Sequence, residues 1–188
     1  MSQVRDDLGD TQRRSALIRH AIRVTRTLVI LRHAKAERPA GVADIDRPLT
    51  ARGHADATAA GAWLASRGYA PDLVLCSPSK RTRQTWHGVA TALTGSTSPE
   101  VRYEPVLYDD GVRQAIRLVR TVPDEVGTVL LIGHNPTVSA LSALLDRAAA
   151  RDSDGLRTSG IAVHTLDGPW SGYAPGAAPL VMTGTARA

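Results

Sequence analysis

Hydrophobic and polar residues alternate along this chain in a way that predicts both strands and helices. Three uninterrupted apolar runs predict strands buried on both faces, over residues 27–33, 72–76 and 128–132. Apolar residues spaced three and four apart predict helices over residues 50–67, 80–93, 112–122 and 137–150. Weaker patterns predict further short strands over residues 101–103, 158–166 and 179–182.

Strands that alternate with helices predict an α/β fold. Each helix carries the chain back across one face of the sheet, so successive strands run in parallel. We expect three layers, α/β/α, around a mainly parallel central sheet. Thr50 is placed to cap the first helix and Gly68 to end it. Little chain lies between the first strand and its helix, or between the second helix and the third strand, so no large cap is expected.

The charge distribution separates a short N-terminal extension from a single domain. Residues 1–26 contain six arginines against three aspartates and supply +3 of the net charge of +5. We expect residues 1–25 to form a basic, poorly ordered extension and residues 26–188 to form one domain with a sizeable core. The rest of the chain is close to neutral, and its few Tyr and Trp are not interleaved with basic residues. Nucleic acid is therefore not expected as the main partner.

Composition narrows the class of protein further. Apolar residues make up 43% of the chain and charged residues 22%, as in soluble globular proteins. No apolar run approaches the ~20 residues that span a bilayer, and arginines interrupt the region where a signal peptide would lie. We therefore expect a cytoplasmic protein without a membrane partner. The single cysteine, Cys76, excludes an intramolecular disulfide framework and is expected to be a small buried residue.

Polar residues follow each of the three strongest strands at its carboxyl end. Arg32 and His33 close the first strand, Ser77 follows the second with Arg81 one helical turn later, and His134 follows the third. In an open α/β sheet these strand ends lie along one edge, where ligands bind. The sequence therefore predicts a pocket that gathers two arginines and two histidines.

A near copy of the first of these motifs lies in the extension. Ile18-Arg19-His20-Ala21 repeats most of Leu31-Arg32-His33-Ala34. No uninterrupted apolar strand precedes the earlier copy, which lies among further arginines. The strand context therefore assigns the site to the second copy and leaves the first in a basic tail or short helix.

The predicted group of side chains suits a phosphoryl group. Arg32 and Arg81 offer forked donors to its peripheral oxygens. A neutral imidazole attacks phosphorus if its other nitrogen donates to a backbone carbonyl, which fixes the tautomer. His33 follows directly from a rigid strand and is the better nucleophile of the two histidines. His134 would supply a further donor from the opposite side.

Four segments in this order resemble the histidine phosphatase superfamily, and more closely its short, SixA-like branch of phosphohistidine phosphatases. The segments are Leu31–Glu37, Asp46–Gly53, Ser77–Thr85 and Gly133–Pro136. Each motif is modest alone, but the order and the strand context agree. The resemblance covers about Arg26 to Val181 and implies the histidine phosphatase, or phosphoglycerate mutase-like, fold.

The resemblance also implies a role for each residue. His33 would be the transiently phosphorylated nucleophile. Arg32, Arg81 and His134 would bind the phosphoryl group and stabilise its transition state. Water would then hydrolyse the phosphohistidine intermediate. Such enzymes need no metal, and we expect neither a metal nor a cofactor here.

Two positions leave a choice open. Ala34 stands where most members of the superfamily have Gly, and a left-handed backbone there would cost Ala on the order of 1 kcal/mol. The short branch resembles this chain in carrying Ala, so Ala34 is interpreted as a marker of that branch. Arg47 either reaches the pocket or forms a loop ion pair with Asp44 or Asp46.

The sequence leaves open which carboxylic acid, if any, protonates the leaving group. Larger relatives take this acid from an inserted segment. The candidates here are Glu104, Asp109 and Asp110, of which Asp109 is favoured, and solvated loop acids are the alternative. A phosphorylated imidazole leaves as a neutral group once its free nitrogen is protonated, so phosphohistidine needs less help than an alkyl phosphate.

The expected reaction is the hydrolysis of phosphohistidine on a protein. An uncapped pocket admits a residue that projects from a protein surface, and it admits small phosphomonoesters too. A small-molecule phosphomonoesterase is therefore the alternative among enzymes. A non-catalytic phosphate-binding regulatory module is the alternative of another class. The presence of both arginines and both histidines argues against that module.

Overall fold

The computed structural model describes residues 25–93, 98–109, 111–146 and 155–188. The predicted extension lies outside these ranges except for Thr25, its last residue, which begins the first strand. Arg19 and His20 of the near copy and the candidate acid Asp110 lie outside them as well. What the sequence predicts for these residues stays a prediction.

A six-stranded sheet forms the centre of the molecule. Its strands are β1 (Thr25–Arg32), β2 (Leu73–Cys76), β3 (Glu100–Tyr103), β4 (Thr128–Gly133), β5 (Gly160–Asp167) and β6 (Leu180–Thr185). They lie in the order β3-β2-β4-β1-β5-β6. The strands from β3 to β1 are parallel to one another, β5 is antiparallel to β1, and β6 is antiparallel to β5. The prediction of a mainly parallel sheet is confirmed.

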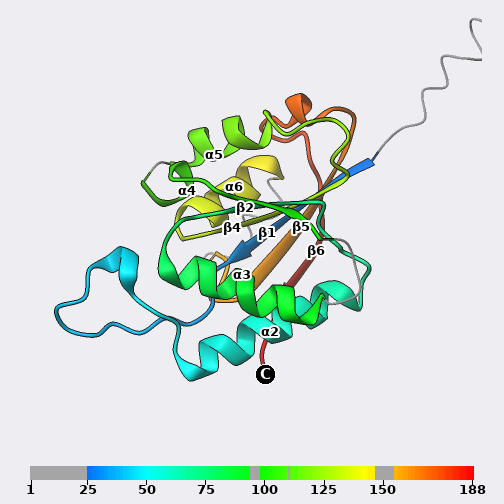
Figure 1. Ribbon diagram of the computed structural model, residues 1–188. Helices are drawn as coiled ribbons and strands as arrows, with labels where there is room; N and C mark the ends of the chain where they lie inside the picture. Colours follow the sequence, from blue (N-terminus) through cyan, green and yellow to red (C-terminus); the bar gives the residue numbers. More distant parts are fainter. Residues whose placement is uncertain (1–24, 94–97, 110, 147–154) are drawn as a thin grey trace, which may run out of the picture.

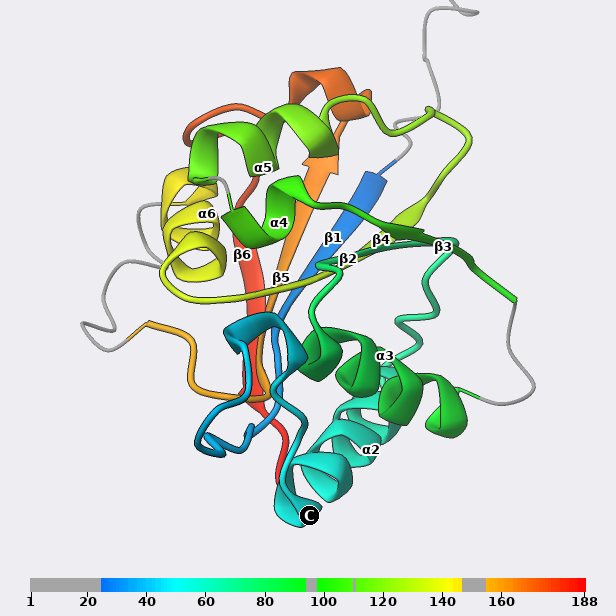
Figure 2. The same ribbon diagram turned by 60° about the vertical axis from the view of Figure 1, so that its left-hand side comes forward.

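Helices cover both faces of this sheet (Figures 1 and 2). α2 (Ala51–Ala65) and α3 (Lys80–Ala92) pack on one face. α4 (Val106–Asp109), α5 (Val112–Val119) and α6 (Thr137–Leu145) pack on the other. The predicted α/β/α layering is confirmed, and no large cap lies over the sheet in the described part of the chain. None of the described helices is long and apolar enough to cross a membrane.

Short elements and helix ends are where the structure departs from the prediction. α5 ends at Val119, whereas its predicted end is Val122. α6 ends at Leu145, whereas its predicted end is residue 150. The turn α4 and the 3-10 turn η1 (Asp44–Asp46) were not predicted. A single turn buries too few side chains to leave a periodic pattern in the sequence.

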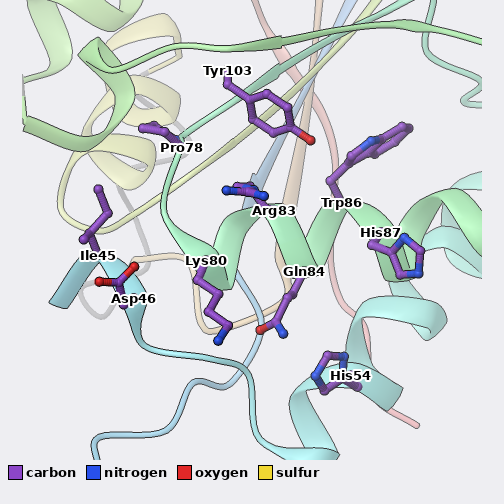
Figure 3. A pocket seen from close by; sticks show the side chains of 10 residues that line it. All are labelled: Ile45, Asp46, His54, Pro78, Lys80, Arg83, Gln84, Trp86, His87 and Tyr103. Atoms are coloured by element: carbon purple, nitrogen blue, oxygen red, sulfur yellow. The ribbon is translucent and has the colours of Figure 1, made fainter. Parts of the chain in front are cut away.

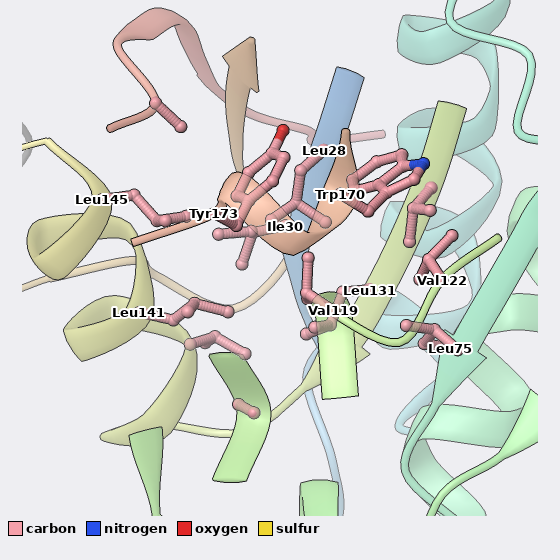
Figure 4. Packing of buried hydrophobic residues seen from close by; sticks show 14 of the residues in the cluster. Leu28, Ile30, Leu75, Val119, Val122, Leu131, Leu141, Leu145, Trp170 and Tyr173 are labelled. Atoms are coloured by element: carbon pink, nitrogen blue, oxygen red, sulfur yellow. The ribbon is translucent and has the colours of Figure 1, made fainter. Parts of the chain in front are cut away.

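Strand β1 separates two hydrophobic cores. Leu28 and Ile30 belong to the core beneath α5 and α6, and Val29 and Leu31 belong to the core beneath α2 and α3. Figure 4 shows the first of these cores. The alternation follows from the period of two along a strand, and burial on both faces explains why β1 carries no polar residue between Leu28 and Leu31.

The segment from Gly168 to Pro179 was predicted as a loop, and this prediction is incomplete. It contains the 3-10 turn η3 (Trp170–Gly172). The side chains of Trp170 and Tyr173 are fully buried and stack with ring centroids 5.1 Å apart. Trp170 Nε1 donates to the carbonyl oxygen of Val126 at 2.7 Å. Two large aromatic residues therefore anchor the segment in the core (Figure 4).

The start of α2 and its packing on α3 agree with the sequence signals. The hydroxyl of Thr50 accepts the backbone N–H of Gly53 at 2.9 Å, and Gly68 has a φ of +72° just beyond the helix. A Cβ atom on Gly61 would lie 2.3 Å from the carbonyl oxygen of Val89. Glycine thus allows the close contact that positions α3, and with it Arg81, beside the strand ends.

Candidate active site

The carboxyl ends of β1, β2 and β4 lie side by side, as predicted. Arg32 pairs in register with Gly133, and the backbone N–H of His33 donates to the carbonyl oxygen of Gly133 at 3.0 Å. The N–H of Ser77 donates to the carbonyl oxygen of Ile132, also at 3.0 Å. The three polar turns therefore start from one edge of a rigid sheet.

His33 has the tautomer that a nucleophile needs. Its Nδ1 lies 2.7 Å from the carbonyl oxygen of Ala34. A carbonyl oxygen only accepts, so Nδ1 carries the proton and Nε2 keeps its lone pair. Burial, together with the nearby Arg81 and Arg32 cations, lowers the pKa of His33 to about 4. The ring is therefore neutral at neutral pH.

His134 faces His33 across the site. The two ring centroids are 5.0 Å apart. Arg81 Nε donates to Nδ1 of His134 at 3.3 Å, so the proton of His134 is on Nε2, which lies 2.8 Å from the hydroxyl of Ser77. Burial, His33 and Arg81 lower the pKa of His134 to about 3. Tyr108 packs edge-on against its ring, with the centroids 5.6 Å apart.

Arg81 is held at the first turn of α3 with 6% of its surface exposed. Its Nη2 lies 2.8 Å from a carboxylate oxygen of Asp44, and its Nη1 donates to the backbone carbonyl of the same residue at 2.5 Å. Its Nε is directed at His134. The guanidinium is therefore oriented on two sides, by an imidazole and by a loop aspartate.

Arg32 has a donor to spare. Its Nη1 donates to the carbonyl oxygen of Leu156 at 2.9 Å. Its Nε is buried and has no acceptor within the part of the chain that the structure describes. Burial lowers the pKa of Arg32, and the Arg32 cation in turn lowers the pKa of both imidazoles. A buried donor of this kind favours an anionic acceptor.

The turn after β1 is fixed by contacts from distant segments. The N–H of Ala34 donates to the hydroxyl of Thr85 at 3.1 Å, and that hydroxyl donates to the carbonyl oxygen of Arg81. Ala34 is fully buried, and its φ is not positive, so alanine costs no strain here. Ser159 has a φ of +56°, and its N–H is shared between the carbonyl oxygens of Arg32 and His33.

Asp44 is the residue of the site that the sequence did not predict. It lies in η1 and accepts from Arg47 Nη1 at 2.6 Å and from the hydroxyl of Tyr108 at 3.0 Å, besides its contact with Arg81. The bond from Arg47, with those from Tyr108 and Arg81, holds the pKa of Asp44 well below its usual range. Arg47 thus forms the loop ion pair, with Asp44 as its partner.

No hydrogen bond or ion pair between described residues joins the side chain of Asp109 to the four predicted residues. Asp109 is the exposed last residue of α4, and its side chain makes no hydrogen bond or ion pair with any described residue. Its neighbour Tyr108 contacts the site instead, through Asp44 and His134. Asp109 as the general acid therefore remains a prediction.

The charges of this cluster suit an anion. The four predicted residues supply two guanidinium groups and two neutral imidazoles, and the carboxylate that contacts them, that of Asp44, is paired with Arg47 as well. Within the described residues, no group of three or more His, Cys, Asp or Glu side chains is arranged to hold a metal ion. Cys76 is fully buried beside the site, and burial raises the pKa of its thiol to about 12.

Comparison with known proteins agrees with this geometry. Residues 28–109 match the histidine phosphatase superfamily (branch 1). The chain is 33% identical to phosphohistidine phosphatase SixA of Escherichia coli over 138 residues, which are 73% of this chain and 84% of the relative. These 138 residues exceed two thirds of both proteins. The chain belongs to the histidine phosphatase superfamily.

Solved structures place it within the SixA-like group. A candidate phosphohistidine phosphatase SixA from Nakamurella multipartitia has a TM-score of 0.75 at 36% identity, with 87% of this chain and 98% of that one covered. The protein histidine phosphatase SixA complexed with tungstate has a TM-score of 0.70 at 28% identity, with 85% and 96% covered. The chain is thus a SixA-like phosphatase, a hydrolase.

Proposed function

We propose that this phosphatase hydrolyses phosphohistidine on a protein, through a phosphorylated intermediate on His33. The observation that carries the proposal is the hydrogen bond between His33 Nδ1 and the carbonyl oxygen of Ala34, which leaves Nε2 unprotonated. The ring of His33 lies beside that of His134, with the centroids 5.0 Å apart, and within electrostatic reach of Arg32 and Arg81. A neutral nucleophile next to fixed cations suits an in-line attack on a phosphoryl group.

The first step forms a bond from His33 Nε2 to phosphorus and breaks the bond from phosphorus to the substrate imidazole. The proton on Nδ1 stays in place, so phosphorylated His33 is an imidazolium whose N–H still donates to Ala34. The substrate enters with a proton on the nitrogen that is not phosphorylated, so its imidazole leaves neutral and keeps that proton. This leaving group needs no carboxylic acid, which agrees with the exposed position of Asp109.

The second step returns the enzyme to its starting state. Water attacks phosphorus, the bond to His33 Nε2 breaks, and its electron pair returns to the ring. Inorganic phosphate leaves with the proton that the water loses. The reaction needs no metal, because the arginines supply the positive charge that a metal would supply to the transferring oxygens.

Arg32 and Arg81 bind the peripheral oxygens in both steps. Arg32 Nε has no acceptor among the described residues and is ready for a phosphoryl oxygen. Arg81 Nη1 and Nη2 are bound to Asp44 in this structure, so the phosphoryl group takes these donors over from Asp44. His134, neutral here, gains basicity when the dianion arrives, because a nearby negative charge raises an imidazole pKa.

A protein substrate is favoured over a small ester by the open surroundings of the site. Asp44 and Tyr108, which flank Arg81, lie in exposed or half-exposed turns, and no described segment closes over them. The name of the relative in Escherichia coli, phosphohistidine phosphatase, supports the same substrate.

Two measurements test the proposal. Wild-type protein mixed with a radiolabelled phosphohistidine peptide and denatured in alkali should retain label, whereas His33→Ala should retain none. The value of kcat/KM for that peptide should exceed the value for p-nitrophenyl phosphate. Higher efficiency on the ester would refute the substrate and favour a phosphomonoesterase. Phosphate binding without turnover of either donor would refute catalysis and favour a regulatory module.

A further inference from the structure

A groove opens beside the active site along the exposed side of α3. It has a volume of about 770 Å³ and is bordered by η1, the start of α2 and β3. Figure 3 shows Lys80, Arg83 and Gln84 projecting from α3, with Asp46 on one side and His87 on the other. None of the steps of the proposed reaction uses these residues.

The groove carries unpaired positive charge. Lys80, Arg83, Gln84 and His87 follow the i, i+3, i+4, i+7 spacing, so they form one stripe along α3. Lys80 and Arg83 are exposed, and neither forms an ion pair with any residue of the described ranges. The lining contains one carboxylate, that of Asp46. An acidic occupant would complement the two cations.

The groove also has apolar contact area, which an inorganic anion does not need. Tyr103 is 49% exposed and Ile45 is 38% exposed. The guanidinium of Arg83 lies over the ring of Tyr103, 5.7 Å from its centroid, and half-buried Trp86 extends the lining. Tyr, Trp and Arg side chains that reach the surface together are typical of residues that anchor protein interfaces.

The groove is continuous in the chain with the active site. Lys80 precedes Arg81, and Pro78 follows Ser77, which contacts His134. On the other border, Asp46 lies in the same turn as Asp44, the partner of Arg81. A segment that occupies the groove therefore ends next to the phosphoryl site.

We propose that this groove binds an acidic stretch of the substrate protein, next to the phosphohistidine that enters the site. The proposal rests on the proposed function and adds the local chemistry of its substrate. The cations of Lys80 and Arg83 select acidic side chains. The rings of Tyr103 and Trp86 pack against the apolar parts of the same stretch.

The test compares two phosphohistidine peptides that differ only in flanking charge, one with Glu residues and one with Gln at the same positions. Wild-type protein at low salt should have a kcat/KM about fivefold to tenfold higher for the Glu peptide, mainly through KM. The ratio should fall toward one at about 0.5 M salt, because salt screens exposed charges.

Variants assign the preference to the groove. Lys80→Glu combined with Arg83→Glu should abolish or reverse the Glu-to-Gln ratio. Arg117→Glu is the matched control, an exposed arginine on α5 across the sheet, and it should keep the wild-type ratio. The ratio is measured within each protein, so partial unfolding of a variant lowers both rates and leaves the ratio unchanged.

Each outcome decides a separate point. A wild-type ratio near one, or a ratio that survives the double variant, overturns the docking proposal and leaves the proposed function standing. If wild-type protein hydrolyses p-nitrophenyl phosphate but neither peptide, the proposed function is overturned, and the docking proposal with it. A ratio that disappears only in the double variant supports both.

Discussion

The active site has two parts that differ in how they are held. Arg32, His33 and His134 stand on the ends of buried parallel strands, where the backbone bonds of the sheet position them. Asp44 and Tyr108 stand on single turns, where Asp44 pairs with Arg81 and Tyr108 packs against the ring of His134. We infer that the strand ends carry the chemistry, whereas the turns adjust binding and release.

The largest expected effect is that of removing the nucleophile. His33→Ala should lower kcat by at least about 10³-fold, because no other neutral nitrogen occupies the position of Nε2. Single-turnover assays with a phosphohistidine peptide measure the loss. Phosphopeptide hydrolysis at more than a tenth of the wild-type rate would contradict the role of His33.

Replacing the deeper arginine should have the next largest effect. Arg81→Ala should lower kcat/KM by about 10²-fold to 10³-fold, because it removes forked donors from the transferring oxygens. Arg81→Lys should recover only part of the loss, since an ammonium does not bind two oxygens in the same plane. Equal rates in the two variants would show that orientation by the fork does not matter.

The pH dependence of activity tests whether burial and nearby cations lower the pKa of His33 at the end of β1. Protonation of His33 removes the lone pair, and its pKa of about 4 lies below the ordinary value of 6.5. Activity should therefore hold as pH falls from 7 through 5 and fall only near pH 4. An NMR titration of the His33 ring checks this directly. In Arg81→Ala the pKa should rise, because a neighbouring cation is lost. A His33 midpoint near 6.5 in the wild type would contradict the burial argument.

Changes in the turns should have smaller effects. Asp44→Asn should lower the Ki of inorganic phosphate about fivefold, because Arg81 then loses a competing carboxylate whose side chain is 53% exposed. Inhibition assays at low salt measure the change, and Asp46→Asn is the control on the same turn. A weaker affinity for phosphate in Asp44→Asn would place Asp44 among the groups that assist binding.

The smallest effect is expected at the exposed end of α4. Asp109→Asn should change kcat by less than about threefold, because the side chain is exposed and makes no hydrogen bond or ion pair with the described residues of the site. A phosphohistidine peptide and p-nitrophenyl phosphate should be assayed together. A loss of about 10²-fold on either substrate would identify Asp109 as the general acid after all.

The two parts of the site also differ in how far the sequence predicts them. Residues at the ends of apolar strands are predictable, since parallel strands share an edge, and this reasoning placed His33, Arg81 and His134 together. Asp44 approaches Arg81 through the path of an irregular loop, which leaves no periodic pattern. The burial of Trp170 was not predicted for a related reason. The glycines and prolines around it indicate a loop, and a loop pattern does not show which side chains are buried.

The atom that accepts the proton of His33 belongs to the main chain. Every amino acid at position 34 would present the same carbonyl oxygen, so point mutation there changes the packing with Leu49 and Ala57 before it changes the tautomer. A point mutation at position 34 therefore leaves in place the acceptor that fixes the tautomer of His33. Only a change that moves the backbone of this turn would remove the hydrogen bond from Nδ1 of His33 to that carbonyl oxygen.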